Sequence, residues 1–267
     1  MKLRAMPDAR GAETTDDAIL GGRLRLLQPR RGHRVGHDAV LLAAATDAQA
    51  GDHIVDFGAG VGAAGLALLA RVPNTAVTLV EIDPQLTALA TENIARNGYA
   101  DRARAVVLDV AAGDASFAAA GLPPASADRV MMNPPFNDPG RQQISPDPRR
   151  RAAHVVSGSP AVWIEAAARL LRPTGTLTVI WRADGLNELL SALVAHFGGA
   201  RVLPVHGRAG QPAIRAIIAA KKASRALPIV LPPFFLNDFA GQPTQEAERV
   251  LRDAKELEMQ KMSDRLP

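Results

Sequence analysis

The chain has 267 residues, a formal net charge of +4, 47% hydrophobic and 22% charged residues, and a sequence pI near 9.9. This length can bury a substantial core, and the composition is ordinary for a soluble globular protein. Cysteine is absent and the six histidines show no metal-ligand spacing, which argues against disulfides and a metal site. No apolar run approaches the ~20 residues that a membrane span requires, and residues 1–10 lack the apolar stretch of a secretory signal. The default expectation is a cytoplasmic enzyme, and the mild basic excess permits nucleic-acid binding without establishing it.

The first part of the chain has weak patterning. Residues 1–24 are expected to form a loosely ordered start, although the stretch from Gly22 to Gln28 alternates weakly and could be a strand or a hairpin arm. A turn-forming segment over 31–38 follows. Asp38 ends it and is well placed as the N-cap of an apolar helix over 39–48.

From Asp52 onward, predicted strands and helices alternate, which favours an α/β fold with a mostly parallel sheet and helices on both faces. The expected strands are 53–57, 76–82, 104–108, 129–132, 175–181, 201–205 and 213–221. The expected helices are 63–71, 84–97, 160–171 and 185–197. Residues 227–239 are expected to be an extended packing segment, and 244–262 a surface helix. No internal repeat is present, so one domain over 25–240 with a C-terminal surface helix in 241–267 accounts for the length.

A glycine-rich loop follows the first strand of this sheet and opens a helix. Gly58, Gly60 and Gly62 would let the backbone turn sharply and approach a ligand at the carboxyl ends of the strands. Gly60, Gly62 and Gly65 also satisfy the G-x-G-x-x-G dinucleotide fingerprint, so a nicotinamide or flavin enzyme is a candidate. Glu81 lies near the ~20-residue distance expected of a ribose-binding carboxylate, which both cofactor classes would need.

Asp56 distinguishes these candidates. A carboxylate just ahead of the loop would repel a pyrophosphate, but it suits an amino group or a sulfonium cation. The order Asp-x-Gly-x-Gly resembles the first motif of class I S-adenosylmethionine-dependent methyltransferases, whose fold is a Rossmann-like doubly wound sheet with one antiparallel strand near the C-terminus. The resemblance implies that S-adenosylmethionine is the cofactor, with Asp56 and the loop along its methionine portion and Glu81 on the ribose hydroxyls. It also places Asp109 at the adenine amine. Alternatively, Asp109 caps a turn, and Asp83 is expected to cap the helix that begins at Pro84.

A second motif, Asn133-Pro134-Pro135-Phe136, follows the strand that ends at Met132. Two prolines forbid both a ladder hydrogen bond and an immediate helix, so the chain must turn stiffly. The side-chain oxygen of Asn133 and the carbonyl of Pro134 can accept two hydrogen bonds from one NH₂ group, and Phe136 offers a face for stacking. The motif indicates a holder for a planar amine; the alternative is a rigid proline turn with a half-buried Phe. In a doubly wound sheet this strand neighbours the one that carries Asp56, so both loops would open into one crevice.

The Asn-Pro-Pro-Phe turn resembles the fourth motif of amino-methyltransferases that act on adenine, guanine or glutamine amides. Together, the segments 34–42, 132–138 and 145–149 resemble the bacterial tRNA (adenine-N(6))-methyltransferases that modify valine tRNA beside the anticodon, and the likeness covers about residues 25–240. It implies catalytic roles for Asn133, Pro134 and Phe136, with Pro135 facing the substrate. It also implies that Gly36 and Asp38 lie near the cofactor, although His37 departs from the small residue expected there.

Basic residues follow the proline turn. The arginines at 149–151 (Arg149, Arg150 and Arg151) could hold RNA phosphates next to the crevice, and Lys221, Lys222 and Arg225 form a second basic cluster; a solvated charge run is the alternative. The expected partner is RNA, most simply tRNA, with no metal and no membrane, and the oligomeric state is open. The rivals are an rRNA guanine amino-methyltransferase, a protein glutamine methyltransferase and a non-catalytic RNA-binding module. The glutamine enzymes normally carry Tyr where Phe136 stands and a helical domain in front of the first strand.

Overall fold

A computed structural model of the chain describes residues 14–31, 34–135, 159–257 and 259. Several positions singled out in the sequence lie outside these ranges, so the predictions for them stay predictions. They are Phe136, the segment 145–149 and the arginines at 149–151.

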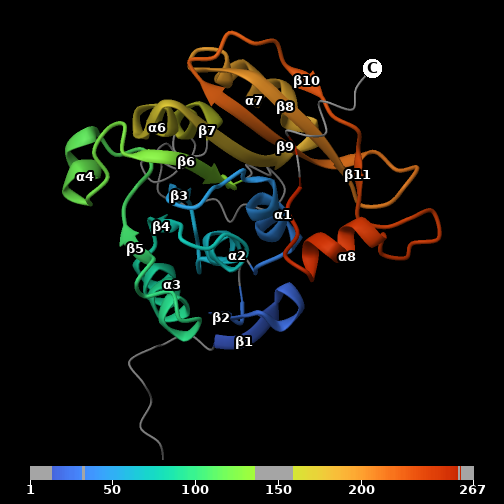
Figure 1. The fold of residues 1–267 in the computed structure, drawn as a ribbon, viewed down its shortest axis with the longest axis horizontal. Helices are drawn as coiled ribbons and strands as arrows, with labels where there is room; N and C mark the ends of the chain where they lie inside the picture. The colour runs from blue at the N-terminus through green and yellow to red at the C-terminus, as the bar shows by residue number, and fades with distance from the viewer. Residues whose placement is uncertain (1–13, 32–33, 136–158, 258, 260–267) are drawn as a thin grey trace, which may run out of the picture.

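Within the described residues, nine strands form one central sheet in the order β10-β8-β9-β7-β6-β3-β4-β5, with β11 added beside β8 (Figure 1). The strands are β3 (His53–Phe57), β4 (Ala76–Glu81), β5 (Ala103–Val107), β6 (Ala127–Met132), β7 (Leu171–Arg182), β8 (Phe197–His206), β9 (Ala213–Lys222), β10 (Ile229–Val230) and β11 (Phe234–Phe235). All neighbours pair in parallel except β9, which is antiparallel to both β7 and β8. The predicted fold class is confirmed, including the single reversed strand near the C-terminus.

Helices cover both faces of this sheet (Figure 1). They are α1 (His37–Ala45), α2 (Ala63–Arg71), α3 (Pro84–Arg96), α4 (Asp114–Ala119), α6 (Pro160–Leu170), α7 (Leu186–Leu193) and α8 (Gln245–Leu251), with short 3-10 turns η1 (Leu20–Gly22) and η2 (Ala183–Gly185). One buried hydrophobic cluster lies under α1, α2, α3 and α8, and the other under α4, α6 and α7. Successive strand residues alternate between them: Ile54 belongs to the first cluster and Val55 to the second. The strands are therefore apolar on both faces, as parallel strands between helices require.

The start of α1 differs from the prediction. Gly36 is its N-cap and the helix begins at His37, so Asp38 lies in the first turn and makes no capping hydrogen bond. Its carboxylate instead pairs with Arg215 of β9, with 2.8 Å between Oδ2 and Nε. The ion pair fixes Asp38 across the sheet, and a remote partner of this kind is not visible in the local sequence.

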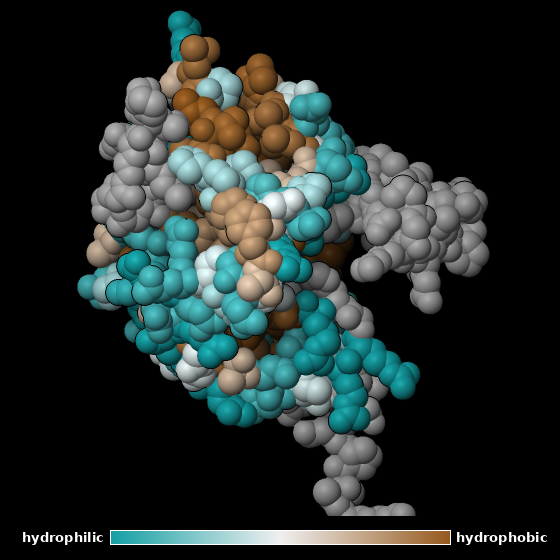
Figure 2. All heavy atoms as spheres, turned by 90° about the vertical axis from the view of Figure 1, so that its right-hand side faces the viewer, coloured by the Kyte–Doolittle hydropathy of each residue, from teal (hydrophilic) through white to brown (hydrophobic). Residues whose placement is uncertain are grey.

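The C-terminal surface helix predicted within 241–267 is also wrong in its extent. Helix α8 ends at Leu251, and the chain continues in non-helical form to Leu257, whose N–H donates to the carbonyl of Ala44 in α1 at 2.8 Å. Leu257 and Met259 are buried in the same cluster as α1. Because these apolar side chains are anchored against α1, the chain leaves the helical path after two turns. Figure 2 shows the face of the molecule that carries α8 and β11, largely hydrophilic with a hydrophobic group at its upper end.

The N-terminal residues 14–24 are not loosely ordered. Strand β1 (Thr14–Ile19) pairs antiparallel with β2 (Leu24–Pro29), so the predicted hairpin arm is confirmed, but as half of an ordered hairpin. Two asparagines one turn apart, Asn93 of α3 and Asn97 at its C-cap, hold β2. Asn93 accepts from Leu27 N–H (2.7 Å) and donates to Leu27 O (2.9 Å), and Asn97 does the same for Arg25 (3.0 and 2.8 Å). The two amides thus replace a neighbouring strand, because each presents an acceptor and a donor to the backbone.

Replacing Asn93 with alanine is expected to lower the free energy of unfolding by roughly 3 kcal/mol, since three hydrogen bonds of about 1 kcal/mol each are lost at a buried site. The third is the bond from Asn93 Nδ2 to Val61 O (3.0 Å), which ties the hairpin to the glycine loop. Asn97→Ala should lose about 1 kcal/mol, because Asn97 is half-buried and its two bonds to Arg25 are exposed to solvent. Denaturant unfolding measures both values. Equal losses for the two variants would show that Asn93 is not the main anchor.

Candidate active site

Two loops emerge side by side where parallel strands of the sheet end. Phe57 of β3 is in register with Met132 of β6, so the next residues along the chain, Gly58 and Asn133, are the first beyond two adjacent strands. Phe57 is also in register with Val80 of β4, which brings Glu81 to the same edge. The carboxyl edge of a doubly wound sheet is where such folds bind ligands. The structure thus brings the acid–glycine loop and the Asn-Pro-Pro turn together.

The glycine loop needs its glycines for two different reasons. Gly58, Gly60 and Gly62 have φ of +68°, +56° and +89°, a region that side chains with a Cβ rarely adopt. A Cβ on Gly58 would lie 2.8 Å from the ring of Trp163 in α6, and one on Gly62 would lie 2.8 Å from Leu79. A Cβ on Gly60 would meet nothing within 4 Å. Gly58 and Gly62 are therefore packed from behind, whereas Gly60 faces the opening of the loop.

This difference predicts opposite effects of two alanine substitutions. Gly58→Ala is expected to destabilise the protein by several kcal/mol, because it adds a clash with Trp163 to the backbone strain. Gly60→Ala should cost only about 1–2 kcal/mol of stability, from the strain alone, but it should weaken ligand binding at the loop at least ~10-fold. Thermal unfolding and titration with S-adenosylmethionine separate the two effects. Unchanged binding in Gly60→Ala would remove the loop from the ligand site.

Asp56 is buried beneath the loop. Its side chain is 2% exposed, and Oδ2 accepts a hydrogen bond of 3.0 Å from the N–H of Gly65 in the first turn of α2. The pKa of this carboxyl is raised to about 7, mainly by burial; the hydrogen bond from Gly65 opposes the rise and the nearby charge of Glu81 adds to it. The helix N–H that could face a pyrophosphate is thus already engaged by an acid, which counts against the dinucleotide candidate. Asp56 fastens the loop from below, and its predicted contact with cofactor stays a prediction.

Glu81 is joined to the loop directly. Its Oε2 accepts from Gly60 N–H at 2.8 Å and its Oε1 accepts from Asp83 N–H at 2.9 Å, in a largely buried position. Each carboxylate oxygen keeps a second lone pair that can accept from a hydroxyl group. Asp83 itself caps α3, since its Oδ1 accepts from Gln85 N–H at 2.8 Å, as expected from the sequence.

Sequence reasoning missed two apolar side chains at this edge. Ile82 directly follows Glu81 and is 59% exposed, and Val107, the partner of Glu81 on β5, is 54% exposed. Exposed branched side chains next to a polar anchor provide an apolar surface for a flat ligand. The available signal was an apolar residue immediately after the acid that ends a strand.

Asp109 follows β5 and lies close to this group, since Leu108 N–H donates to Glu81 O at 2.9 Å. Its Oδ1 accepts from Ala111 N–H at 2.8 Å, so the carboxylate caps the turn that follows, which is the alternative considered from the sequence. At the start of α1, Asp38 forms an ion pair with Arg215, and Gly36 is the N-cap residue of the helix. The predicted cofactor contacts of these three residues therefore rest on the resemblance alone.

The Asn-Pro-Pro turn contains an unusual polar atom. Asn133 Oδ1 is inaccessible to solvent and has no hydrogen-bond partner, while Pro134 is buried and Pro135 is exposed. A buried acceptor without a donor costs about 1–3 kcal/mol, so such atoms are rare unless a ligand or water satisfies them. Asn133 Oδ1 is therefore an unpartnered hydrogen-bond acceptor at the end of β6, next to the glycine loop.

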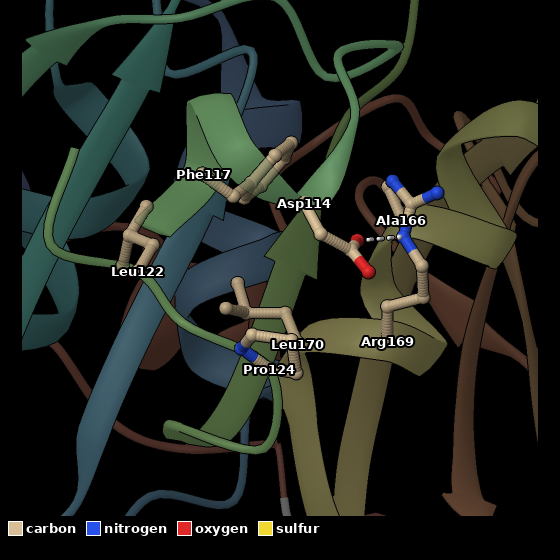
Figure 3. Close-up of a pocket in the computed structure, with 7 residues that line it drawn as sticks. All are labelled: Asp114, Phe117, Leu122, Pro124, Ala166, Arg169 and Leu170. Atoms are coloured by element: carbon tan, nitrogen blue, oxygen red, sulfur yellow. Dashed lines mark ion pairs between the residues drawn. The ribbon is translucent and has the colours of Figure 1, made fainter. Parts of the chain in front are cut away.

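A hollow between α4 and α6 is too small to hold a ligand. It holds about 10 Å³ under the Asp114–Arg169 ion pair of 3.2 Å (Figure 3). That volume is room for about one water molecule at most, so it is a packing gap. Within the described residues, no group of three or more possible metal ligands gathers and no helix is long and apolar enough to cross a bilayer.

The doubly wound sheet with one reversed strand is the fold of a class I methyltransferase. The acid–glycine loop and the unpartnered Oδ1 of Asn133 beside it lie at the edge where this fold binds its ligands. The chain belongs to the methyltransferase small domain family, whose model matches residues 33–207. This membership confirms the predicted enzyme class and, with it, S-adenosylmethionine as the cofactor.

Several curated relatives carry the name tRNA1(Val) (adenine(37)-N6)-methyltransferase. The one from Pedobacter heparinus is 30% identical over 189 residues, covering 69% of this chain and 76% of the relative. Those from Tolumonas auensis and Phocaeicola vulgatus are 28% and 32% identical, over 63% and 60% of this chain and 67% and 64% of theirs. The chain thus spans about two thirds of the length of the relatives it matches.

Solved structures show the same fold. A protein from Agrobacterium tumefaciens described as a predicted O-methyltransferase is 26% identical with a TM-score of 0.70, covering 82% of this chain and 97% of that one. The T. thermophilus 16S rRNA N2 G1207 methyltransferase, solved with AdoMet and guanosine, is 20% identical with a TM-score of 0.55, over 81% of this chain and 52% of its own. The second likeness concerns the fold alone.

Proposed function

We propose that this protein transfers a methyl group from S-adenosylmethionine to the exocyclic amine of an unpaired adenine in tRNA, beside the anticodon of valine tRNA. The observation that carries the proposal is the buried, unpartnered Oδ1 of Asn133 next to the glycine loop. This oxygen can accept a hydrogen bond from an amine, and it lies beside the loop that would hold S-adenosylmethionine. The names of the relatives supply the RNA and the adenine.

The residues around the loop fit the cofactor. S-adenosylmethionine supplies an electrophilic methyl carbon on a positively charged sulfur. Gly60 leaves room for close approach, and Glu81 keeps lone pairs for two ribose hydroxyls. Ile82 and Val107 offer an apolar surface to a purine. The two acids, Asp56 and Glu81, favour a cation over a pyrophosphate at this edge.

The Asn-Pro-Pro turn would act on the acceptor amine. An aryl NH₂ lends its lone pair to the ring and is a poor nucleophile. Hydrogen bonds from the NH₂ to Asn133 Oδ1 and to the Pro134 carbonyl would favour a pyramidal nitrogen whose lone pair points at the methyl carbon. No general base is needed for the attack, and the proton leaves to solvent afterwards. The rate gain comes from alignment and from exclusion of water around the reacting groups.

The rest of the substrate would be held by residues that follow the turn. Phe136 would stack on the adenine, which must first leave its own stack, so an unpaired base is favoured. The arginines at 149–151 would hold phosphates of the RNA. These roles rest on the sequence, because both segments lie outside the described residues.

The proposal is tested in two reactions, each containing the protein and radiolabelled S-adenosylmethionine. One contains tRNA and the other contains rRNA, both from a strain that lacks the gene. Digestion and nucleoside mass analysis should find N6-methyladenosine in the tRNA. Methylguanosine in rRNA would instead support the guanine enzyme, and label on protein the glutamine enzyme. Binding of S-adenosylmethionine without transfer to any RNA would leave only the binding module.

A further inference from the structure

A second polar hollow lies away from the reacting edge, on the face of the sheet that α1 covers. Its lining residues come from three adjacent strands: Thr176 of β7, Ala219, Ala220 and Lys221 of β9, and Arg201 of β8. The hollow has a volume of about 200 Å³. Thr176 is in register with Arg129 of β6, four residues before the level of Asn133, which corresponds to roughly 13 Å along the strands. The hollow is therefore separate from the methyl-transfer site.

The sheet register aligns the polar groups on one face. Thr178 is opposite Ala219, and Ala219 is opposite Arg201, so these side chains share a face of the sheet. Thr176 and Lys221 form the next row on that face. The β8–β9 register shifts between Gly198 and Arg201, and after this irregularity Arg201 lies opposite Ala219.

Two of these groups are buried without partners. Thr178 is 1% exposed and its Oγ1 has no hydrogen-bond partner, and the buried Nε of Arg201 has none either. Among the described carboxylates, none forms an ion pair with Arg201 or Lys221. A buried guanidinium N–H and a buried hydroxyl without partners are each costly, since buried polar groups are normally satisfied.

The chemistry of the lining selects an anion. A guanidinium and an ammonium in the lining supply two positive charges, and the Thr176 hydroxyl in the lining supplies a further donor. Thr178 does not line the hollow, but it adds a hydroxyl one row away on the same face, opposite the lining residue Ala219. A phosphate group carries enough oxygens to accept from all of them, and arginine binds it with paired N–H donors. We infer that Arg201, Thr178, Thr176 and Lys221 form a phosphate-group site on this face of the sheet. The phosphate is either free inorganic phosphate or a phosphodiester of bound RNA, and only the RNA source rests on the proposed function.

The second basic cluster of the sequence is divided by this site. Lys221 lines the hollow and is exposed at its mouth, so the hollow opens to solvent. The Lys222 ammonium instead donates to the carbonyl of Leu171 at 2.6 Å and supports the strand start. Arg225 is exposed and does not line the hollow. Of three basic residues within five positions, one is thus assigned to the site, and Arg225 provides a charge-matched control.

The first test titrates inorganic phosphate into the full-length protein at constant ionic strength, with chloride as the reference, and follows binding by calorimetry and by the unfolding temperature. Wild type should bind phosphate, and Arg201→Gln should bind it at least ~10-fold more weakly, the loss expected for one charge-assisted contact. Thr178→Val removes only the buried hydroxyl, so it should fold at least as stably yet also bind more weakly. Arg225→Gln should match wild type. No phosphate binding by wild type, or equal binding by all variants, would overturn the site.

The second test identifies the source of the phosphate. The affinity for tRNA of wild type, Arg201→Gln and Arg225→Gln is measured over a range of salt concentrations. A weaker affinity and a salt slope reduced by about one in Arg201→Gln alone would assign the site to an RNA phosphodiester. Unchanged tRNA binding together with lost inorganic phosphate binding would assign it to free phosphate. Thr178→Val repeats the comparison if Arg201→Gln does not fold.

Discussion

Asn133→Ala is expected to reduce methyl transfer at least ~100-fold without destabilising the protein, since misplacement of a reacting group by an ångström costs about that factor. In the structure its Oδ1 is buried and unpartnered, so the truncation removes no hydrogen bond accepted by that oxygen. It removes the acceptor that would orient the amine. The free energy of unfolding should stay equal or rise by up to about 1–3 kcal/mol, because an unsatisfied buried acceptor disappears.

The measurement combines single-turnover methyl transfer, S-adenosylmethionine affinity and denaturant unfolding for Asn133→Ala and for Asn97→Ala. Asn97 is the control because it is also an asparagine at the end of an element, the C-cap of α3. Unlike Asn133, its side-chain oxygen and nitrogen are both bonded to the backbone of Arg25. Asn97→Ala should lose stability and keep activity, and Asn133→Ala should do the reverse, with its cofactor affinity unchanged. Full turnover by Asn133→Ala would refute its role in holding the amine.

The fold could be predicted because its elements are decided locally. The strands of the sheet are short apolar runs, and α2 and α3 were expected within one residue of their observed ends. Errors occurred where remote contacts decide. The hairpin over 14–29 is ordered because Asn93 and Asn97 bind β2 from α3, more than sixty residues away in the chain. Asp38 is drawn to Arg215, and the end of α8 is set by the anchoring of Leu257.

The site was predictable as a set of residues but not as a set of directions. The motifs placed the glycine loop, Glu81 and Asn133 at one edge, and the register brings them together. A motif does not say which way a side chain points, and Asp56, expected along the ligand, lies 2% exposed under the loop. Ile82 was missed because exposure of an apolar residue depends on the packing around it. The unpartnered state of Asn133 Oδ1 likewise exists only in three dimensions.

Burial of Asp56 predicts that the protein loses stability as pH rises towards neutrality. The pKa of this carboxyl is raised from 3.8 to about 7 in the folded protein, so the folded state binds a proton that the unfolded state has released. The contribution of Asp56 is fully present below pH 3.8 and is lost as pH rises through 7. Between pH 5 and pH 8 the loss should be about 2–3 kcal/mol, at about 1.4 kcal/mol for each pH unit of the window.

Asp56→Asn isolates this contribution, because the amide oxygen of an asparagine can still accept from Gly65 N–H but the side chain does not titrate. Denaturant unfolding of both proteins at pH 5 and pH 8 should show the variant gaining about 2–3 kcal/mol relative to wild type at the higher pH. Parallel curves would mean that the carboxylate is ionised at both pH values.

The same proton links stability to the proposed ligand. A sulfonium and an ammonium group near the loop would favour the ionised form of Asp56, so cofactor binding should release a proton near neutral pH. The affinity of wild type for S-adenosylmethionine should therefore rise from pH 6 to pH 8, while that of Asp56→Asn stays level. Calorimetry in buffers of different ionisation enthalpy counts the released protons. A wild-type affinity that does not change with pH would show that the cation lies too far from Asp56 to influence it.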